Sequence, residues 1–172
     1  MTGNFPACLE FVLKHEGGWA DHPRDPGGAT MRGVTLAVYQ NYLSRKVSKE
    51  ELRKIPQKHL VDIYKSLYWD RTKCDDLAGG VDLVVFDMAV NAGVSRSARI
   101  LQRCVGAVPD GVIGPRTMAL VNGISAKDII VKFSDGRENF YKSLPTFDTF
   151  GKGWLRRTKE CEDQALSMIG DK

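Results

Sequence analysis

The chain has 172 residues with 42% hydrophobic and 27% charged side chains, which excludes a chain that is disordered throughout. A chain of this length buries about 70% of its unfolded surface, so it forms a hydrophobic core without disulfides or metals. The formal net charge is only +4, with 12 basic and 12 acidic residues over 1–90 and 13 and 9 over 91–172. We therefore expect no nucleic-acid partner, because such proteins carry a denser basic stripe.

The first helix is predicted after Asn4, a good N-cap residue, and before Gly17-Gly18, which end helices. Four residues at the spacing i, i+3, i+4 and i+7 form its inward face, namely Leu9, Val12, Leu13 and Glu16. A carboxylate on this otherwise apolar face marks Glu16 as the most informative residue of the chain.

Residues 19–35 interrupt the helical pattern. Turn-forming Pro and Gly residues precede a short β-prone stretch over 29–35, which predicts an irregular loop leading into a small hairpin. Helices are then expected after Thr35 as N-cap, after the capping box Ser48-x-x-Glu51, and from Pro56 onward.

The second half of the chain is predicted to be helical. Residues 80–92 are almost wholly apolar, which indicates a buried central helix. Ser95 is a candidate cap for the next helix, and a turn-rich connector follows that helix. Helices are expected over 96–105, 115–122, 126–142 with Gly136 as a candidate break, and about 150–168. The predicted fold is mainly α, a helical bundle with one small β-hairpin near the N-terminus.

The cysteines and the hydropathy indicate the compartment. Cys8, Cys74, Cys104 and Cys161 have no metal-ligand spacing, and we interpret them as reduced core residues. The N-terminus does not resemble a signal peptide, and no apolar stretch approaches the roughly 20 residues of a membrane helix. We expect a protein that is made in the cytoplasm, without stable membrane insertion, and that is a monomer.

Glu16 is the candidate general acid. It ends its predicted helix directly before two glycines, where burial and the negative end of the helix dipole both favour a protonated carboxyl. Asp25, Thr30 and Thr35 follow in the loop and hairpin and can supply a second carboxylate and hydroxyls that hold a water, as glycosidic cleavage requires. Two alternatives stay open: a structural ion pair for Glu16 and a purely turn-forming role for Asp25.

These residues resemble the opening of the glycoside hydrolase family 108 muramidases of the lysozyme-like superfamily. The family has Glu-Gly-Gly-Tyr, then Asp-Pro-Gly-Gly-x-Thr, then Gly-Ile-Thr. This chain has Leu13-Lys-His-Glu-Gly-Gly-Trp19, Asp25-Pro-Gly-Gly-Ala-Thr30 and Gly33-Val-Thr35. Trp19 replaces the usual Tyr and keeps an aromatic ring for stacking on a sugar. The resemblance implies a lysozyme-like fold, with Glu16 as the catalytic acid.

The resemblance continues downstream. Phe86-Asp87-Met-Ala-Val-Asn91-Ala-Gly93 is similar to the family's central helix, where the Asn lines the saccharide cleft. With Gln102, this segment supplies the substrate-binding candidates Asp87, Asn91 and Gln102 beside Trp19. The alternative for Asp87 and Asn91 is that they only hydrogen-bond inside the core.

The C-terminal part resembles a small peptidoglycan-binding module. Asp110-Gly-Val-Ile-Gly-Pro-Arg-Thr117 and Phe150-Gly-Lys-Gly-Trp154-Leu-Arg-Arg157 are similar to its motifs, although a turn and a helix start explain the first motif equally well. We therefore predict a catalytic domain over 1–105 and a helical binding module over 106–172.

The resemblance implies hydrolysis of the β-1,4 bond between N-acetylmuramic acid and N-acetylglucosamine, with peptidoglycan glycan strands as partner and no metal or organic cofactor. A lytic transglycosylase acting on the same bond, or a non-catalytic wall-binding protein, are the alternatives. Without a signal peptide, such an enzyme needs a release route, either a holin for a phage endolysin or an exporter for a bacterial muramidase. We expect it to act in the periplasm or cell wall after release.

Overall fold

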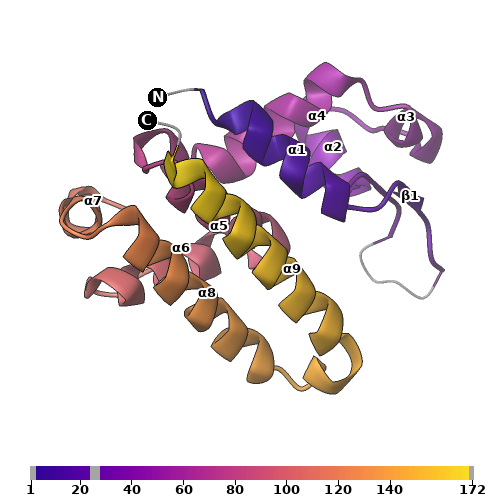
Figure 1. The fold of residues 1–172 in the computed structure, drawn as a ribbon. Coiled ribbons are helices and arrows are strands. Elements are labelled where there is room, and N and C mark those ends of the chain that lie inside the picture. The colour runs from indigo at the N-terminus through magenta and orange to yellow at the C-terminus, as the bar shows by residue number, and fades with distance from the viewer. Residues whose placement is uncertain (1–2, 24–27, 171–172) are drawn as a thin grey trace. The chain divides into compact units, whose positions relative to one another are not determined.

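The computed structural model describes residues 3–23 and 28–170 (Figure 1). Packing divides the chain into two compact units, one formed by residues 9–67 and the other by residues 1–8 and 68–172. The helices are α1 (Phe5–His15), α2 (Leu36–Leu43), α3 (Lys49–Arg53), α4 (Gln57–Tyr64), α5 (Val81–Ala92), α6 (Val94–Val105), α7 (Pro115–Asn122), α8 (Ala126–Lys142) and α9 (Phe147–Ser167). The strands are β1 (Trp19–Ala20), β2 (Thr30–Met31) and β3 (Val34–Thr35). The predicted mainly α fold with a small β element near the N-terminus is confirmed.

The three strands form one antiparallel sheet in the order β1-β2-β3 within the unit 9–67. Trp19 lies opposite Met31, and Thr30 lies opposite Thr35. Arg32 and Gly33 connect β2 to β3 with φ values of 49° and 84°. A two-residue turn with both φ values positive matches the right-handed twist of the strands it joins. The predicted hairpin is confirmed, and β1 is an additional strand that the sequence did not indicate.

Local capping signals set the helices that follow the sheet. Thr35 Oγ1 accepts a hydrogen bond from the Val38 backbone N–H at 3.1 Å, and Ser48 Oγ accepts one from the Glu51 N–H at 3.1 Å. Both groups satisfy a backbone donor that has no partner inside the helix. Pro56 occupies the N-cap position of α4. The three helix starts expected in this unit are therefore confirmed.

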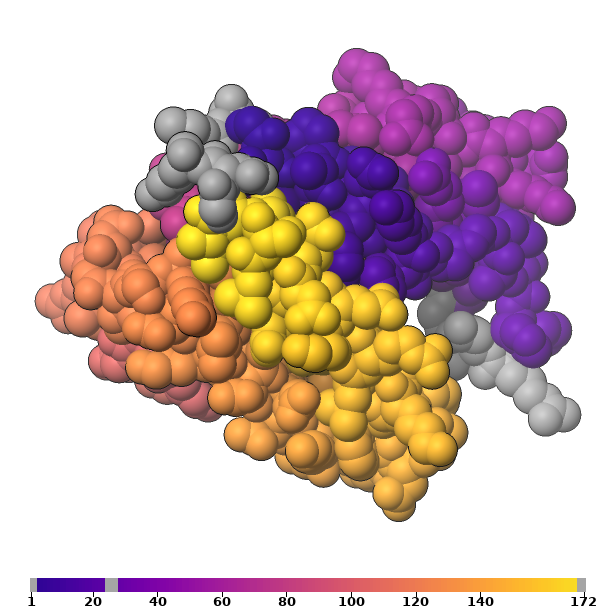
Figure 2. Space-filling view, viewed as in Figure 1, coloured from indigo at the N-terminus to yellow at the C-terminus, as the bar shows by residue number. Residues whose placement is uncertain are grey.

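The other unit is built around α5. Every residue from Val81 to Ala89 is buried, which confirms the predicted central helix. Phe86 packs edge-on against Trp69, with ring centroids 5.3 Å apart. Helices α6, α8 and α9 all pack against α5, and α8 and α9 lie side by side in the ribbon and space-filling views (Figures 1 and 2). The core of this unit therefore lies where the four helices meet.

Three predicted details of the helices are wrong. Helix α6 begins at Val94, because the Ser97 N–H bonds to the Gly93 carbonyl at 3.1 Å, so Ser95 lies inside the helix and does not cap it. Helix α8 is unbroken at Gly136, where a Cβ would meet Ile100 at 3.1 Å; the glycine allows close helix contact. Helix α9 begins at Phe147, whose ring packs on Gly151.

The predicted boundary between residues 105 and 106 is not where packing divides the chain. Helices α6, α7 and α8 belong to the same compact unit, although the predicted boundary separates α6 from α7 and α8. The division into a catalytic domain and a binding module therefore stays a prediction about roles.

Most of the cysteines lie in the core. Cys8, Cys74 and Cys161 are buried, Cys104 is half-buried, and none forms a disulfide. Across residues 3–23 and 28–170, no helix has the length and apolar character needed to cross a membrane.

Candidate active site

Glu16 directly follows the last residue of α1. Its backbone N–H continues the helical pattern by bonding to the Val12 carbonyl at 3.1 Å. Leu9 and Val12 on the same face are buried, and the Glu16 side chain is half-buried. The predicted inward face is confirmed, and it delivers a carboxylate to the edge of the apolar region.

The Glu16 side chain lies against the turn of the hairpin. A Cβ placed on Gly33 would lie 3.1 Å from Glu16 Oε2 and 3.3 Å from Glu16 Cγ, and it would collide with the hydroxyl oxygen of Tyr64. The Tyr64 hydroxyl donates a hydrogen bond of 2.6 Å to the Arg32 carbonyl. Two features therefore require glycine at position 33. Its φ is positive, and these two side chains fill the space beside it.

Sequence reasoning missed the part that Tyr64 and Gly33 play at this site. Gly33 belongs to a matched motif that gives it no role of its own, and Tyr64 is a core residue, 1% exposed, with no motif around it. A glycine within the β-prone stretch 29–35 was the available signal, since glycine inside a strand pattern often marks a close approach of another group. No local pattern connects Tyr64 to a turn 32 residues earlier.

The two threonines face each other across β2 and β3, and both are half-buried. Thr35 Oγ1 is the acceptor that caps α2, so its oxygen is already engaged. Thr30 lies in the central strand between Ala20 and Thr35. Their predicted role in holding a water stays a prediction, and Asp25, the predicted second carboxylate, lies outside the described residues.

Trp19 is half-buried in β1, one of the two outer strands of the sheet. The guanidinium of Arg53 lies 5.6 Å from the centroid of its ring, at cation–π distance. This contact holds the ring, and stacking of a sugar on it stays a prediction.

Asp87 forms a double ion pair inside the unit built around α5. Its carboxylate accepts from Arg137 Nη1 at 2.7 Å and from Arg157 Nη2 at 2.7 Å, and the side chain is 0% exposed. Burial raises the pKa of Asp87, but the two guanidinium groups outweigh burial and hold that pKa below its usual value. This geometry favours the alternative in which Asp87 bonds inside the core, and its contact with substrate stays a prediction.

Asn91, one helical turn further along α5, is exposed. Its Oδ1 accepts a hydrogen bond of 2.8 Å from the Tyr141 hydroxyl. The Tyr141 ring stacks on Trp154 with centroids 5.0 Å apart, and Trp154 lies 5.7 Å from Phe150, which is 54% exposed. Three helices therefore bring an amide and a row of aromatic rings together, a combination suited to sugars that the sequence did not reveal.

Gln102 is fully buried and holds the loop that precedes α7. Its Nε2 donates to Asp110 Oδ1 at 2.8 Å and to the Val112 carbonyl at 2.9 Å, and its Oε1 accepts from the Gly111 N–H at 2.9 Å. The Asp-Gly motif is therefore a loop tied to α6. Binding of substrate by Gln102 stays a prediction, although its amide is occupied by the protein.

Within residues 3–23 and 28–170, no three His, Cys, Asp or Glu side chains are grouped so that they could hold a metal ion.

Comparison with known proteins identifies the family. The profile of Glycosyl hydrolase 108 matches residues 9–93, which contain Glu16, the sheet and α5. Among solved structures, the structure of Brucella abortus SagA is 41% identical in sequence, with a TM-score of 0.90 over 100% of this chain and 99% of that chain. No curated protein matches the chain. The chain therefore belongs to glycosyl hydrolase family 108 and is a glycoside hydrolase with a lysozyme-like, mainly α fold.

Proposed function

We propose that this glycoside hydrolase is an N-acetylmuramidase that cleaves the β-1,4 bond between N-acetylmuramic acid and N-acetylglucosamine in peptidoglycan, with Glu16 as general acid. The observation that carries the proposal is the position of the Glu16 carboxylate, held at the end of α1 beside the Gly33 turn. This carboxylate lies within the segment that matches the family.

Glu16 donates its proton to the oxygen of the leaving sugar while positive charge develops on the ring that is cleaved. Asp25 supplies the second carboxylate, and Thr30 and Thr35 orient the water. A separation of about 5–5.5 Å between the two carboxylates gives retention of the anomeric configuration, and about 6.5–9.5 Å gives inversion. Gly33 and Tyr64 position the acid, because the Glu16 side chain and the Tyr64 hydroxyl together fill the space beside the glycine.

Trp19 and Asn91 contact the glycan under this proposal. Trp19 offers a ring that Arg53 holds in place, and Asn91 is exposed with its amide oxygen fixed by Tyr141. The amide NH₂ of Asn91 then serves as donor to sugar hydroxyl or acetamido oxygens.

The proposal is tested with Glu16→Gln on purified peptidoglycan, with mass analysis of the products. The change keeps the size of the side chain and removes the acid proton, so we expect activity to fall about 10²- to 10⁴-fold. The matched control is Glu10→Gln on the same helix, whose carboxylate makes only an exposed contact of 3.6 Å with Lys14 and whose loss leaves activity unchanged.

The products separate the proposed reaction from its rivals. Wild-type enzyme is expected to release fragments with reducing ends formed by addition of water. Fragments ending in 1,6-anhydro sugars would instead identify a lytic transglycosylase. Unchanged activity of Glu16→Gln would refute the assignment of the acid, and wall binding without cleavage by the wild type would identify a non-catalytic binding protein.

A further inference from the structure

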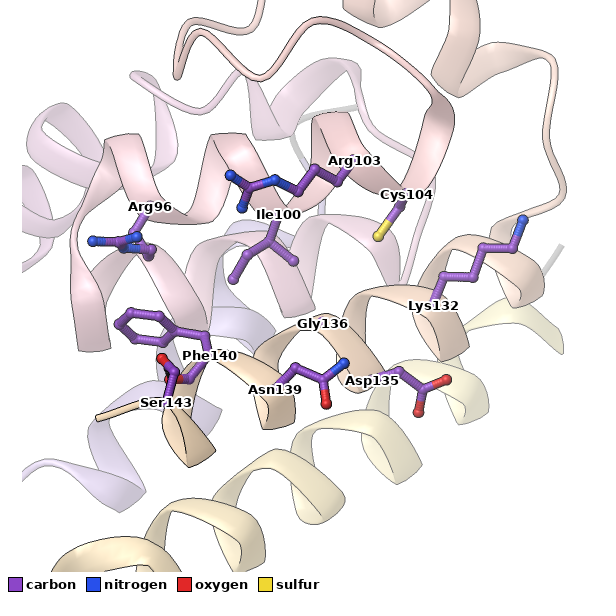
Figure 3. A pocket seen from close by; sticks show the side chains of 10 residues that line it. All are labelled: Arg96, Ile100, Arg103, Cys104, Lys132, Asp135, Gly136, Asn139, Phe140 and Ser143. Carbon is purple, nitrogen blue, oxygen red and sulfur yellow. Dashed lines mark hydrogen bonds between the residues drawn. The ribbon is translucent and has the colours of Figure 1, made fainter. Parts of the chain in front are cut away.

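An open pocket of about 690 Å³ lies between α6 and α8 and contains none of the residues assigned to the candidate active site (Figure 3). The two helices approach closely where Gly136 faces Ile100, since a Cβ on that glycine would lie 3.1 Å from Ile100 Cγ2. Phe140 and Cys104 add apolar surface towards opposite ends. The volume is in the range of pockets that bind small molecules or peptide fragments.

Three cations line this pocket, Arg96 and Arg103 on α6 and Lys132 on α8. All three are exposed, and none forms an ion pair with a carboxylate in the part of the chain that the structure describes. Arg96 instead lies over the Phe140 ring, 4.6 Å from its centroid. By contrast, Lys142 on α8 pairs with Glu138 at 3.7 Å. The pocket therefore concentrates positive charge that the protein does not neutralise.

The pocket also offers one acidic and one amide side chain, Asp135 and Asn139, on α8. Cys104 adds no charge, because burial raises the pKa of its thiol to about 11. The lining thus combines three cations, one carboxylate, an amide and an apolar strip. Such a set suits a ligand with several carboxylates, one ammonium and small apolar groups.

The pocket is long enough for an extended peptide. Arg96 and Arg103 are seven residues apart on α6, which is a rise of roughly 10 Å. Figure 3 shows Arg96 beside Phe140 at one end and Lys132 near Cys104 at the other. An extended tripeptide also spans about 10 Å, which matches the length of α6 between these two residues.

We propose that this pocket binds the acidic peptide stem of peptidoglycan. The inference rests on the proposed function, because the stem is attached to the glycan that the active site cleaves. A stem fragment of alanine, D-glutamate and diaminopimelate carries three carboxylates and one ammonium, which complements the three cations and Asp135. Arginine forks bind carboxylates through two parallel hydrogen bonds, and the alanine methyl group fits the apolar strip at Ile100.

A phosphate-bearing polymer fits the pocket less well. Asp135 repels phosphate and favours an ammonium, which such a polymer need not carry. The apolar surface of Ile100 and Phe140 gains nothing from a phosphate group but is covered by a peptide. These features favour the peptide as the occupant.

Binding is tested with the synthetic tripeptide L-alanyl-γ-D-glutamyl-diaminopimelate, acetylated at its N-terminus, by titration calorimetry and NMR on the full chain. The test variant is Arg103→Glu/Lys132→Glu. The control is Arg116→Glu/Lys127→Glu, which makes the same charge change at exposed positions outside the pocket. We expect wild type and control to bind equally and the test variant to bind at least tenfold more weakly. No binding by wild type, or equal binding by both variants, would overturn the proposal.

A second assay separates the pocket from the chemistry. We expect the test variant to match wild type on glycan strands freed of peptide by an amidase and to be at least fivefold slower on intact sacculi, with the control matching wild type on both. A wild type that binds the tripeptide but cleaves neither substrate would refute the proposed function and support the pocket assignment. NMR shifts at the pocket that inorganic phosphate saturates and the tripeptide does not cause would overturn the pocket assignment.

Discussion

The end of α1 and the middle of α5 each place a carboxylate in an apolar surrounding, but the two carboxylates have different environments. Asp87 on α5 is completely enclosed, and two guanidinium groups contact it at 2.7 Å. Glu16 after α1 is half-buried beside a glycine turn. A substrate cannot reach an enclosed carboxylate that is paired with two guanidinium groups, whereas it can reach a half-exposed one. An apolar setting therefore marks a carboxylate as important without showing whether the fold or the chemistry uses it.

The largest effect is expected when the carboxylate of Asp87 is removed. Asp87→Ala leaves Arg137, which is 1% exposed, as a buried charge without its partner, and we expect a loss of about 3–5 kcal/mol in the free energy of unfolding. Urea unfolding measures this loss. Glu16→Gln in the same experiment is expected to unfold like wild type. Equal stability of all three proteins would show that Asp87 stabilises the fold no more than Glu16 does.

A second effect concerns the turn beside Glu16. Gly33→Ala places a methyl group against Tyr64 and Glu16, so we expect catalytic activity to fall at least tenfold through displacement of the acid. Gly28→Ala is the matched control, because Gly28 also has a positive φ, 71°, but has nothing within 4 Å of its Cβ position. Activity assays on peptidoglycan compare the two.

The double variant Gly33→Ala/Tyr64→Phe tests the cause of that loss. Removing the Tyr64 hydroxyl makes room for the new methyl group, so part of the lost activity should return. An equal loss of activity in Gly33→Ala and Gly28→Ala would show that backbone strain alone, and not contact with Glu16, makes this glycine necessary.

A smaller effect is expected at Gln102, whose amide is fully used by the loop before α7. Gln102→Ala removes the acceptor for the Gly111 N–H and the donor to the Val112 carbonyl, which should cost about 1–3 kcal/mol. Hydrogen exchange is expected to speed up over 110–117, with catalytic activity per folded molecule unchanged. A selective rise in KM would instead return Gln102 to the substrate-binding residues.

Much of the fold follows from local patterns. The apolar run over 80–92 predicts α5, and the hydroxyl caps Thr35 and Ser48 predict where helices start, because caps and burial act within a few residues. β1 has only two residues and exists through its pairing with β2, so no local pattern announces it. Ser95 shows the opposite failure. It is a good N-cap residue, but the helix begins earlier, because the Gly93 carbonyl accepts a hydrogen bond from the Ser97 N–H.

The residues of the candidate site also differ in whether local sequence patterns reveal them. Glu16 stands out because it is a carboxylate on an otherwise apolar helix face, and this pattern is complete within seven residues. Asp87 cannot be classified from sequence, because its partners Arg137 and Arg157 lie 50 and 70 residues away. The row of aromatic rings beside Asn91 is hidden for the same reason, since it is assembled from α5, α8 and α9.

The smallest effect concerns a third carboxylate, Asp82, five residues before Asp87 on α5. Burial raises the pKa of Asp82, although the Asn4 amide and two backbone N–H groups partly oppose the rise, whereas the arginine pairs hold the pKa of Asp87 below its usual value. The native state therefore binds more protons than the unfolded state at Asp82 and fewer at Asp87. Stability changes with pH in proportion to that difference, so the two residues act in opposite directions.

Asp87 contributes stability that is fully present above its unfolded pKa, near 4, and is lost as the pH falls through its lower folded pKa. Asp82 makes the protein less stable as the pH rises from its unfolded pKa to its higher folded pKa. Urea unfolding of Asp82→Asn between about pH 3.5 and 7 should show the variant gaining on wild type as the pH rises, because the amide keeps the bonds from Gly80 and Leu83 while carrying no charge. A difference that stays constant with pH would show that Asp82 titrates alike in both states, and burial on α5 alone would then not distinguish it from an exposed aspartate.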